Sequence, residues 1–294
     1  MFKVLFLLFG FVLPLLSIEA YQPFIKQYLH ENERYLVSRT FLKNHERYYL
    51  ITHTQTFQTT LAPLEHSNLL PLDNAFYKTP LARALHYATS LHVKGGLAHA
   101  MSQKDGAIYL TMDLCPSRKR GYEQAFTEYV SAYQAKTPIA IAVSSGWIKN
   151  HEASFEALKN HPKLSITWVN HTHTHFYDPH LKENENFMLH SSTDVEKEIL
   201  GLEQTLIEHG VTPSIFFRFP GLKANASLMK ALKERFFLIP LSADAWVAKS
   251  EPIKEGSFIL VHGNKNEPLG IEMLEKMLPE LMKNYRFSPI QEAF

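Results

Sequence analysis

The chain has 294 residues, of which 45% are apolar and 20% are charged, and its formal net charge at pH 7 is +1. This length and apolar content are sufficient to bury a substantial core, which excludes a disordered chain. A nearly neutral charge without a basic tract gives no support for binding along a phosphate backbone, so we exclude nucleic acid as a partner. The single cysteine, Cys115, excludes an intramolecular disulfide.

Residues 1–20 have the layout of a secretory signal peptide. Lys3 precedes an apolar run from Val4 to Leu16, and a more polar stretch then ends at Ala20. The apolar run is too short to span a bilayer comfortably, so we expect cleavage after Ala20, with an uncleaved N-terminal anchor as the alternative. We therefore predict an exported protein, periplasmic or secreted, whose mature form has no stable membrane span.

Residues 21–104 form an N-terminal extension for which we predict a mixed α+β structure. Its clearest segment is "RYYLITHTQTFQTTLAPL", whose threonine-rich composition indicates one or two strands. We find no residues there that point to a chemical reaction, so the sequence assigns this extension no role.

From residue 105 onward, short apolar runs alternate with helical segments. Runs rich in Ile, Val, Phe and Tyr predict buried parallel strands, and they are "AIYLTMDLC", "PIAIAVSSGW", "LSITWVNHT", "SIFFRFP", "FFLIPLSADAW" and "SFILVHGN". The clearest helix spans 193–209, where Thr193 and Glu196 form a capping box and Gly210 is a stop signal. Further helices are predicted near 121–134, 152–160, 225–235 and 270–284. The alternation predicts an α/β fold with a parallel sheet, open or closed into a barrel.

Polar residues fall where these predicted strands end, which is the edge that carries functional sites in parallel sheets. They are Asp113, His171, His175, Arg218, Asp244 and His262. We find no glycine-rich phosphate loop and no serine nucleophile elbow. Such a set predicts metal-assisted hydrolysis, with a carboxylate and a further histidine for proton transfer. His171 and His175 would share one side of a helical turn, whereas His173 would point elsewhere and His180 would lie in a loop.

Five segments, taken in order, resemble the motifs of the polysaccharide deacetylases, the NodB-homology group of carbohydrate esterases. They are "TMDLCP", "NHTHTH", "FRFPG", "DAW" and "ILVHGN", and the resemblance covers residues 105–294. It implies a distorted (β/α)7-type barrel that uses a divalent metal, often zinc, to remove acetyl groups from sugars. An N-acetylated glycan is the partner that this resemblance implies, and the oligomeric state stays open.

The resemblance also implies roles for individual residues. His171 and His175 match the two metal-ligating histidines, and Asp113 matches the general base that takes a proton from water. Arg218 matches the arginine that holds this base ionised. His262 matches the histidine that protonates the departing amine, and Asp244 is the nearest candidate for the acid that tunes that histidine.

Four positions depart from the family pattern. Leu114 stands where most members carry an acid that is the third metal ligand, and Cys115 stands where glycine is usual. The third ligand could then be Asp113 itself, Cys115 as a thiolate, another histidine or water. For Cys115, the interpretation as a small buried apolar side chain is favoured over that as a ligand. Asp244 lies two residues before Trp246 instead of next to it. Gly221 takes the place of a tyrosine, and its backbone N–H is a candidate oxyanion donor.

The leading hypothesis is a metal-dependent deacetylase that acts on peptidoglycan or an exported glycan. Leu114 motivates an alternative, a non-catalytic glycan-binding protein that keeps the barrel with a degenerate site. A third possibility, an O-acetyl esterase or an amidase with a small substrate, would use the same residues on a different leaving group.

Overall fold

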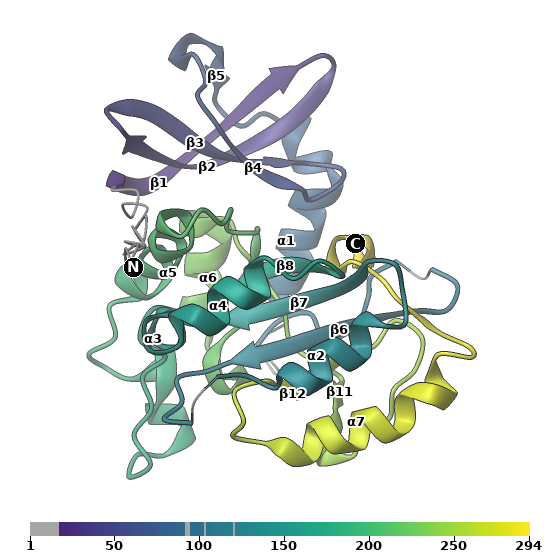
Figure 1. Ribbon diagram of the computed structural model, residues 1–294. Coiled ribbons are helices and arrows are strands. Elements are labelled where there is room, and N and C mark those ends of the chain that lie inside the picture. The colour runs from purple at the N-terminus through teal and green to yellow at the C-terminus, as the bar shows by residue number, and fades with distance from the viewer. Residues whose placement is uncertain (1–17, 92–94, 103, 120) are drawn as a thin grey trace, which may run out of the picture.

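The computed structural model describes residues 18–91, 95–102, 104–119 and 121–294. An antiparallel sheet lies as a separate layer over a parallel sheet that is surrounded by helices (Figure 1). Most of the predicted signal peptide falls on residues 1–17, outside the described residues, and Ile18–Ala20 begin the first strand. Within the part of the chain that the structure describes, no helix is both long and apolar enough to cross a membrane.

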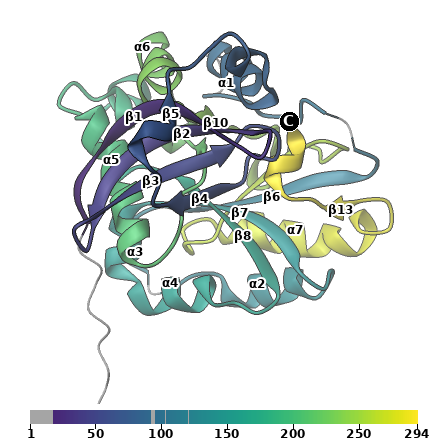
Figure 2. The same cartoon turned by 90° about the horizontal axis from the view of Figure 1, so that it is seen from above.

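The N-terminal extension is a five-stranded antiparallel sheet followed by a helix (Figure 2). The strands have the spatial order β4-β3-β2-β1-β5 and are β1 (Ile18–His30), β2 (Glu33–Lys43), β3 (Glu46–His53), β4 (Thr59–Ala62) and β5 (Leu69–Leu70). Glu31 and Asn32 join β1 to β2, and Asn44 and His45 join β2 to β3. All four have positive φ, as the tight primed turns of hairpins require. The predicted threonine-rich strands are β3 and β4.

Helix α1 (Pro80–Ser90) completes the extension, and the sequence patterns did not predict it. Its start follows the usual rules, because Pro80 occupies the first turn and the Thr79 hydroxyl accepts a hydrogen bond from the Ala82 N–H. Leu81 and Leu85 are buried against the interior of the parallel sheet. The extension is therefore a mixed α+β unit, as predicted.

The rest of the chain forms a curled parallel sheet, a distorted (β/α) barrel, which confirms the predicted fold class. The spatial order is β10-β9-β8-β7-β6-β12-β11, with β13 beside β6. These strands are β6 (Ala107–Leu114), β7 (Thr137–Val143), β8 (Leu164–Asn170), β9 (Phe216–Phe217), β10 (Ile239–Pro240), β11 (Ala245–Trp246), β12 (Phe258–His262) and β13 (Arg286–Phe287). Leu97 and His99 already pair with barrel residues Leu241 and Ser257, so contacts with the barrel begin before residue 105.

Helices follow most of these strands, close to the predicted positions. They are α2 (Gln124–Ser131), α3 (Ser145–Asn150), α4 (Glu152–Lys159), α5 (Val195–Glu208), α6 (Ala226–Ala231) and α7 (Pro268–Leu281), and a π-helical turn, Leu232–Phe236, extends α6. The predicted capping box of α5 is wrong. The Asp194 carboxylate accepts from the Lys197 N–H, whereas the Thr193 hydroxyl donates to the Phe187 carbonyl.

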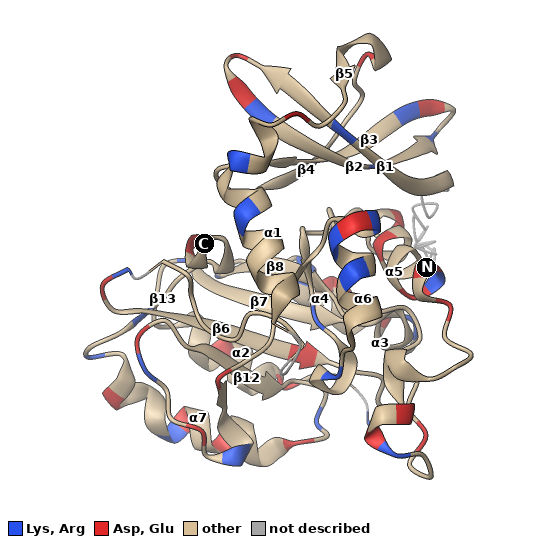
Figure 3. Cartoon of the chain, turned by 180° about the vertical axis from the view of Figure 1, so that it is seen from behind, with Lys and Arg blue, Asp and Glu red and all other residues tan. Residues whose placement is uncertain are grey.

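Charge is nearly excluded from the parallel strands and lies mostly on helices and loops (Figure 3). Among the strands β6 to β13 that the structure describes, Asp113 and Arg286 are the only residues of the types Asp, Glu, Lys and Arg. Side chains alternate along β6, so Met112 and Leu114 face the helices while Asp113 faces the interior with Thr111. A buried charge needs a partner. The barrel interior around Asp113 is therefore the place where chemistry is expected.

A buried ion pair joins the extension to the barrel. Arg39 of β2 donates to both carboxylate oxygens of Glu203 in α5, at 2.7 and 3.0 Å, and both side chains are fully buried. The Tyr21 hydroxyl donates to the same carboxylate at 2.9 Å. Because removing one partner would leave an unpaired buried charge, this contact fixes the extension against α5.

Candidate active site

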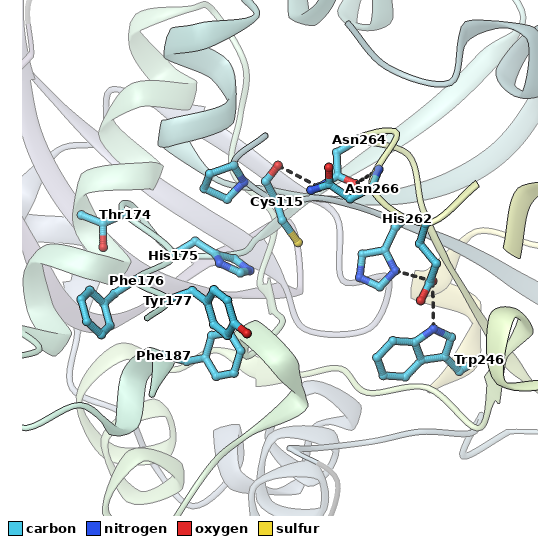
Figure 4. A pocket seen from close by; sticks show the side chains of 12 residues that line it. Cys115, Thr174, His175, Phe176, Tyr177, Phe187, Trp246, His262, Asn264 and Asn266 are labelled. Atoms are coloured by element: carbon cyan, nitrogen blue, oxygen red, sulfur yellow. Dashed lines mark hydrogen bonds and ion pairs between the residues drawn. The ribbon is translucent and has the colours of Figure 1, made fainter. Parts of the chain in front are cut away.

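A cavity of about 700 Å³ opens where the parallel strands end (Figure 4). The cavity is lined by residues from the ends of β6, β8, β11 and β12 and from the loops that follow these strands. The lining residues are Cys115, Pro116, Thr174, His175, Phe176, Tyr177, Phe187, Trp246, His262, Asn264, Asn266 and Glu267. Asp113, His171 and Arg218 are buried beside this cavity. The structure thus gathers five of the six predicted strand-end residues, and Asp244 lies apart from them.

The two predicted metal-binding histidines come from the loop after β8. The strand ends at Asn170, whose side chain accepts from the Thr172 N–H and donates to the Ile199 carbonyl. The predicted helical turn is wrong, because Thr172 and His175 have positive φ and the segment is an irregular bend. This bend still brings the two rings together, with the centroids of His171 and His175 4.7 Å apart.

Helix α5 holds this loop from outside through Glu198, which is 7% exposed. The Glu198 carboxylate accepts from the backbone N–H and from the hydroxyl of Thr174, and its carbonyl accepts from the His173 N–H. The His173 ring packs over Gly201, where an added Cβ would lie 2.9 Å from it. As predicted, His173 therefore points away from His171 and His175.

The ring nitrogens of His171 and His175 are arranged as in metal ligands. His171 Nδ1 donates to the Arg218 carbonyl at 2.9 Å, which leaves Nε2 of the neutral ring as a lone-pair donor. This Nε2 lies 3.5 Å from Cys115 Sγ. His175 Nε2 is buried and has no hydrogen-bond partner among the described residues. An unpartnered buried nitrogen close to a second lone-pair nitrogen fits a bound cation.

One group of side chains brings three ligand atoms within 4.8 Å of one another, and its members are Cys115, His171 and His175. Asp113 is not a member, although its Oδ2 lies 3.8 Å from His171 Nε2. Burial would raise the pKa of the Cys115 thiol, but the charges that His175 and His171 carry when protonated outweigh burial and hold this pKa well below its usual value. The donor set of sulfur and two imidazoles suits zinc.

Arg218 is placed against Asp113, as the sequence predicted. The guanidinium donates to Asp113 Oδ1 at 2.7 Å, to the Thr111 hydroxyl at 2.8 Å and to the Ser242 carbonyl at 3.0 Å. Burial raises the pKa of Asp113, but the charges of Arg218 and of two nearby histidines together outweigh burial, so the pKa falls below its usual value. Asp113 is therefore an ionised carboxylate with one oxygen, Oδ2, left for another partner.

The acid that contacts His262 is Glu267, and the prediction of Asp244 for this position is wrong. Glu267 Oε2 lies 2.8 Å from His262 Nδ1. Asp244, which immediately precedes β11, instead contacts His99 Nδ1 at 2.8 Å and accepts from the Phe258 N–H, at the end of the strands opposite the cavity. Burial lowers the pKa of His262, but hydrogen bonds with Cys115 and Glu267 raise it to about 10.

Aromatic rings form the outer walls of the cavity (Figure 4). Trp246 donates its indole N–H to the same Glu267 oxygen at 3.0 Å, so one carboxylate orients both Trp246 and His262. On the facing wall, the rings of Tyr177 and Phe187 stack with centroids 5.4 Å apart. A Cβ at Gly221 would lie 2.5 Å from the Phe187 ring, so Phe187 occupies the space that a larger residue would take there.

Glu267 is the functional candidate that the sequence patterns missed. It follows His262 by five residues in the loop "GNKNE", beyond the end of the "ILVHGN" motif and without periodicity. The only available signal was an acid close in sequence to a candidate histidine. That signal is weak, because charged residues are common in surface loops.

Comparison with known families covers the part of this site that precedes residue 236. Residues 100–235 match the description "Polysaccharide deacetylase". The match covers a little less than half of the chain, and this segment is similar to polysaccharide deacetylases. Together with the fold, the match supports a hydrolase of the polysaccharide deacetylase type.

Solved structures of two family 4 carbohydrate esterases and of a peptidoglycan deacetylase share the fold. A family 4 carbohydrate esterase from Bacillus anthracis is 19% identical with a TM-score of 0.53, covering 71% of this chain and 91% of its own. PdaA from Bacillus subtilis, also a family 4 carbohydrate esterase, is 13% identical with a TM-score of 0.52, covering 82% and 92%. A peptidoglycan N-acetylglucosamine deacetylase is 17% identical with a TM-score of 0.50, covering 70% and 96%.

Proposed function

We propose that this protein is an exported, metal-dependent hydrolase that removes acetyl groups from an N-acetylated glycan. The supporting observation is the meeting of three kinds of group at one cavity. These are two imidazole nitrogens with lone pairs available to a metal, an arginine-paired carboxylate and a carboxylate-paired imidazole. Amide hydrolysis needs one group to polarise the carbonyl, one to accept a proton and one to donate a proton.

Each residue of the site has a separate task in this proposal. His171 and His175 hold a divalent metal, preferably zinc, which polarises the carbonyl and makes water more acidic when it is bound. Asp113 accepts the proton from water, and Arg218 keeps it ionised for that purpose. His262, charged at neutral pH because its pKa is raised to about 10, donates a proton to the departing amine.

A sugar polymer is the substrate class that the cavity supports. Its volume of about 700 Å³ lies in the range of small-molecule sites, which accommodates one or two sugar rings. Trp246, Tyr177 and Phe187 present aromatic faces on opposite walls, and such faces stack on the apolar faces of sugars. A structurally similar protein acts on peptidoglycan N-acetylglucosamine. Peptidoglycan or an exported polysaccharide is accordingly the proposed target of an exported enzyme.

The test is acetate release by the purified, metal-loaded chain from oligomers of N-acetylglucosamine and from peptidoglycan. We expect release by the native chain, and its loss in the variants His171→Ala and Asp113→Asn. His180→Ala, which changes an exposed loop histidine, is the matched control and should release acetate at the native rate. Absence of release on every glycan, or unchanged release in both site variants, would refute the proposal.

Leu114 favours one alternative, a non-catalytic glycan-binding protein. The alternative predicts that N-acetylated oligomers bind without turnover, so acetate release that tracks metal content excludes it. Against it stands the geometry of Asp113, Arg218 and His262, which a binding protein does not need. An O-acetyl esterase or small-substrate amidase would share the site, and a panel of N- and O-acetylated sugars separates these activities from the proposed one.

A further inference from the structure

The site lacks the acidic side chain that most members of the resembled family carry as the third metal ligand. Leu114 takes that position, and its side chain is fully buried in the core between the sheet and the helices. It packs in the same cluster as Met112 and Val143, on the face of β6 that points away from Asp113. Leu114 can neither coordinate a metal nor reach the cavity, so any third protein ligand comes from another residue.

Cys115 follows Leu114 and points into the cavity. Because side chains alternate along an extended strand, the residue after Leu114 returns to the side on which Asp113 lies. Figure 4 shows the Cys115 sulfur directed into the space between the rings of His175 and His262. The side chain is only partly buried and lines the cavity wall.

The backbone around Cys115 is fixed from two sides. The Asn264 side chain, from the loop after β12, donates to the Cys115 carbonyl at 3.0 Å. On the other side, the Leu114 carbonyl accepts from the Ser144 hydroxyl at 3.3 Å. These contacts fix the backbone that carries the sulfur before any ion binds, which is the arrangement expected of a ligand position.

The distances agree with a shared ion. In a tetrahedral zinc site, sulfur lies about 2.3 Å and nitrogen about 2.0 Å from the metal, so the two ligand atoms are about 3.5 Å apart. Cys115 Sγ and His171 Nε2 are 3.5 Å apart, and His175 provides the third atom within 4.8 Å of both. Asp113 is the competing ligand, but it does not belong to the group of residues whose ligand atoms all lie within 4.8 Å of one another.

We propose that Cys115 is the third protein ligand, forming with His171 and His175 a Cys-His-His metal site that selects zinc. A thiolate is a soft ligand, which favours zinc over magnesium, calcium or manganese. Asp113, bound to Arg218, then stays outside the ligand set and remains free for proton transfer. This inference rests on the metal dependence in the proposed function and not on turnover or on the identity of the glycan.

The decisive experiment replaces zinc with Co²⁺ in the purified full chain and records its absorption spectrum. A cysteine ligand gives a sulfur-to-cobalt charge-transfer band in the near ultraviolet, which nitrogen and oxygen ligands do not give. We expect this band in the native chain and in Asp113→Asn, and we expect its loss in Cys115→Ser and Cys115→Asp. Cys115→Asp should retain the metal, because a carboxylate replaces the thiolate at the same position.

Metal affinity is the second readout, measured by competition with a chelator. Cys115→Ser should weaken zinc binding by at least about 100-fold. Loss of an outer-shell partner costs up to about this factor, and loss of a direct ligand should cost at least as much. Cobalt-loaded native protein without the charge-transfer band would overturn the inference, and the native spectrum decides this even if a variant does not fold. Loss of metal from Asp113→Asn but not from Cys115→Ser would assign the third position to Asp113 and would also overturn it.

The two proposals fail in different ways. A native chain that shows the cobalt band but releases no acetate refutes the deacetylase function and leaves the Cys-His-His site standing. Acetate release that depends on metal in a chain without the band supports the deacetylase and removes Cys115 from the ligand set.

Discussion

The two sides of the cavity are built in different ways. On one side, His171 has a side chain that is only 1% exposed, and the loop that carries it is tied to α5 through Asn170 and Glu198. On the other side, His262 and Glu267 have side chains that are 18% and 29% exposed, and one carboxylate oxygen orients the imidazole. The fold itself therefore positions His171 and His175, which we call the metal side of the cavity. A single loop residue, Glu267, positions His262, which we call the proton-donor side.

This difference separates the expected effects of substitution. Changes on the metal side should alter metal affinity first and turnover as a consequence. Changes on the proton-donor side should alter turnover and its pH dependence while the metal stays bound.

The largest effect is expected for His262→Ala. Loss of the proton donor should lower kcat by about 100- to 10,000-fold, the contribution of a general acid. Zinc content should stay at the native value, because His262 does not belong to the Cys115, His171 and His175 group. Turnover and zinc content measured on one preparation check this, and zinc loss in His262→Ala would show that the two sides are not separate.

A smaller effect on turnover is expected for Glu267→Gln. The neutral amide still fills the space but no longer stabilises the charged imidazole. The fall in kcat should therefore be smaller than the about 100- to 10,000-fold expected when the general acid is lost. Because the Glu267 carboxylate raises the pKa of His262, its removal lowers that pKa, and the protonated donor is lost at a lower pH. The alkaline limb of the pH-rate profile should therefore shift to lower pH.

The control for this variant is Glu272→Gln, in the exposed part of α7, which should leave the profile unchanged. An unmoved alkaline limb in Glu267→Gln would mean that the carboxylate does not set the pKa of His262.

On the metal side, Glu198→Gln should weaken zinc binding. The carboxylate accepts two hydrogen bonds from Thr174, and the amide replaces one acceptor oxygen with a donor. Zinc affinity should fall by about 10-fold, as for the loss of an outer-shell partner, with the pH-rate profile unchanged. Glu196→Gln, on the first turn of the same helix, is the control. Native zinc affinity in Glu198→Gln would contradict the view that α5 holds the metal side.

The smallest effect on activity is expected for Asp244→Asn. This residue contacts His99 and the Phe258 N–H and does not line the cavity. The free energy of unfolding should fall by about 1 kcal/mol, the worth of one hydrogen bond, while kcat stays near the native value. Thermal unfolding and acetate release measure the two quantities. A kcat loss as large as that of Glu267→Gln would restore Asp244 as the tuning acid.

Local patterns in the sequence predicted most of the fold. Apolar runs are sufficient to locate β6, β7, β8 and β12, because a strand buried on both faces carries a continuous apolar sequence. The extension was harder to predict. Its helix α1 is amphipathic only over 11 residues, and its role in covering the barrel interior depends on packing that no local pattern records.

The sequence by itself determined the strand-end positions of Asp113, His171, His175, Arg218 and His262, because chain order and side-chain alternation place such residues at the edge of a parallel sheet. Only the tertiary structure decided which residues contact one another there. It placed Glu267 instead of Asp244 against His262, and it brought Cys115 within 3.5 Å of His171. The reason is physical: loops of irregular conformation carry both Glu267 and His175, and their paths depend on buried hydrogen bonds from residues distant in the chain.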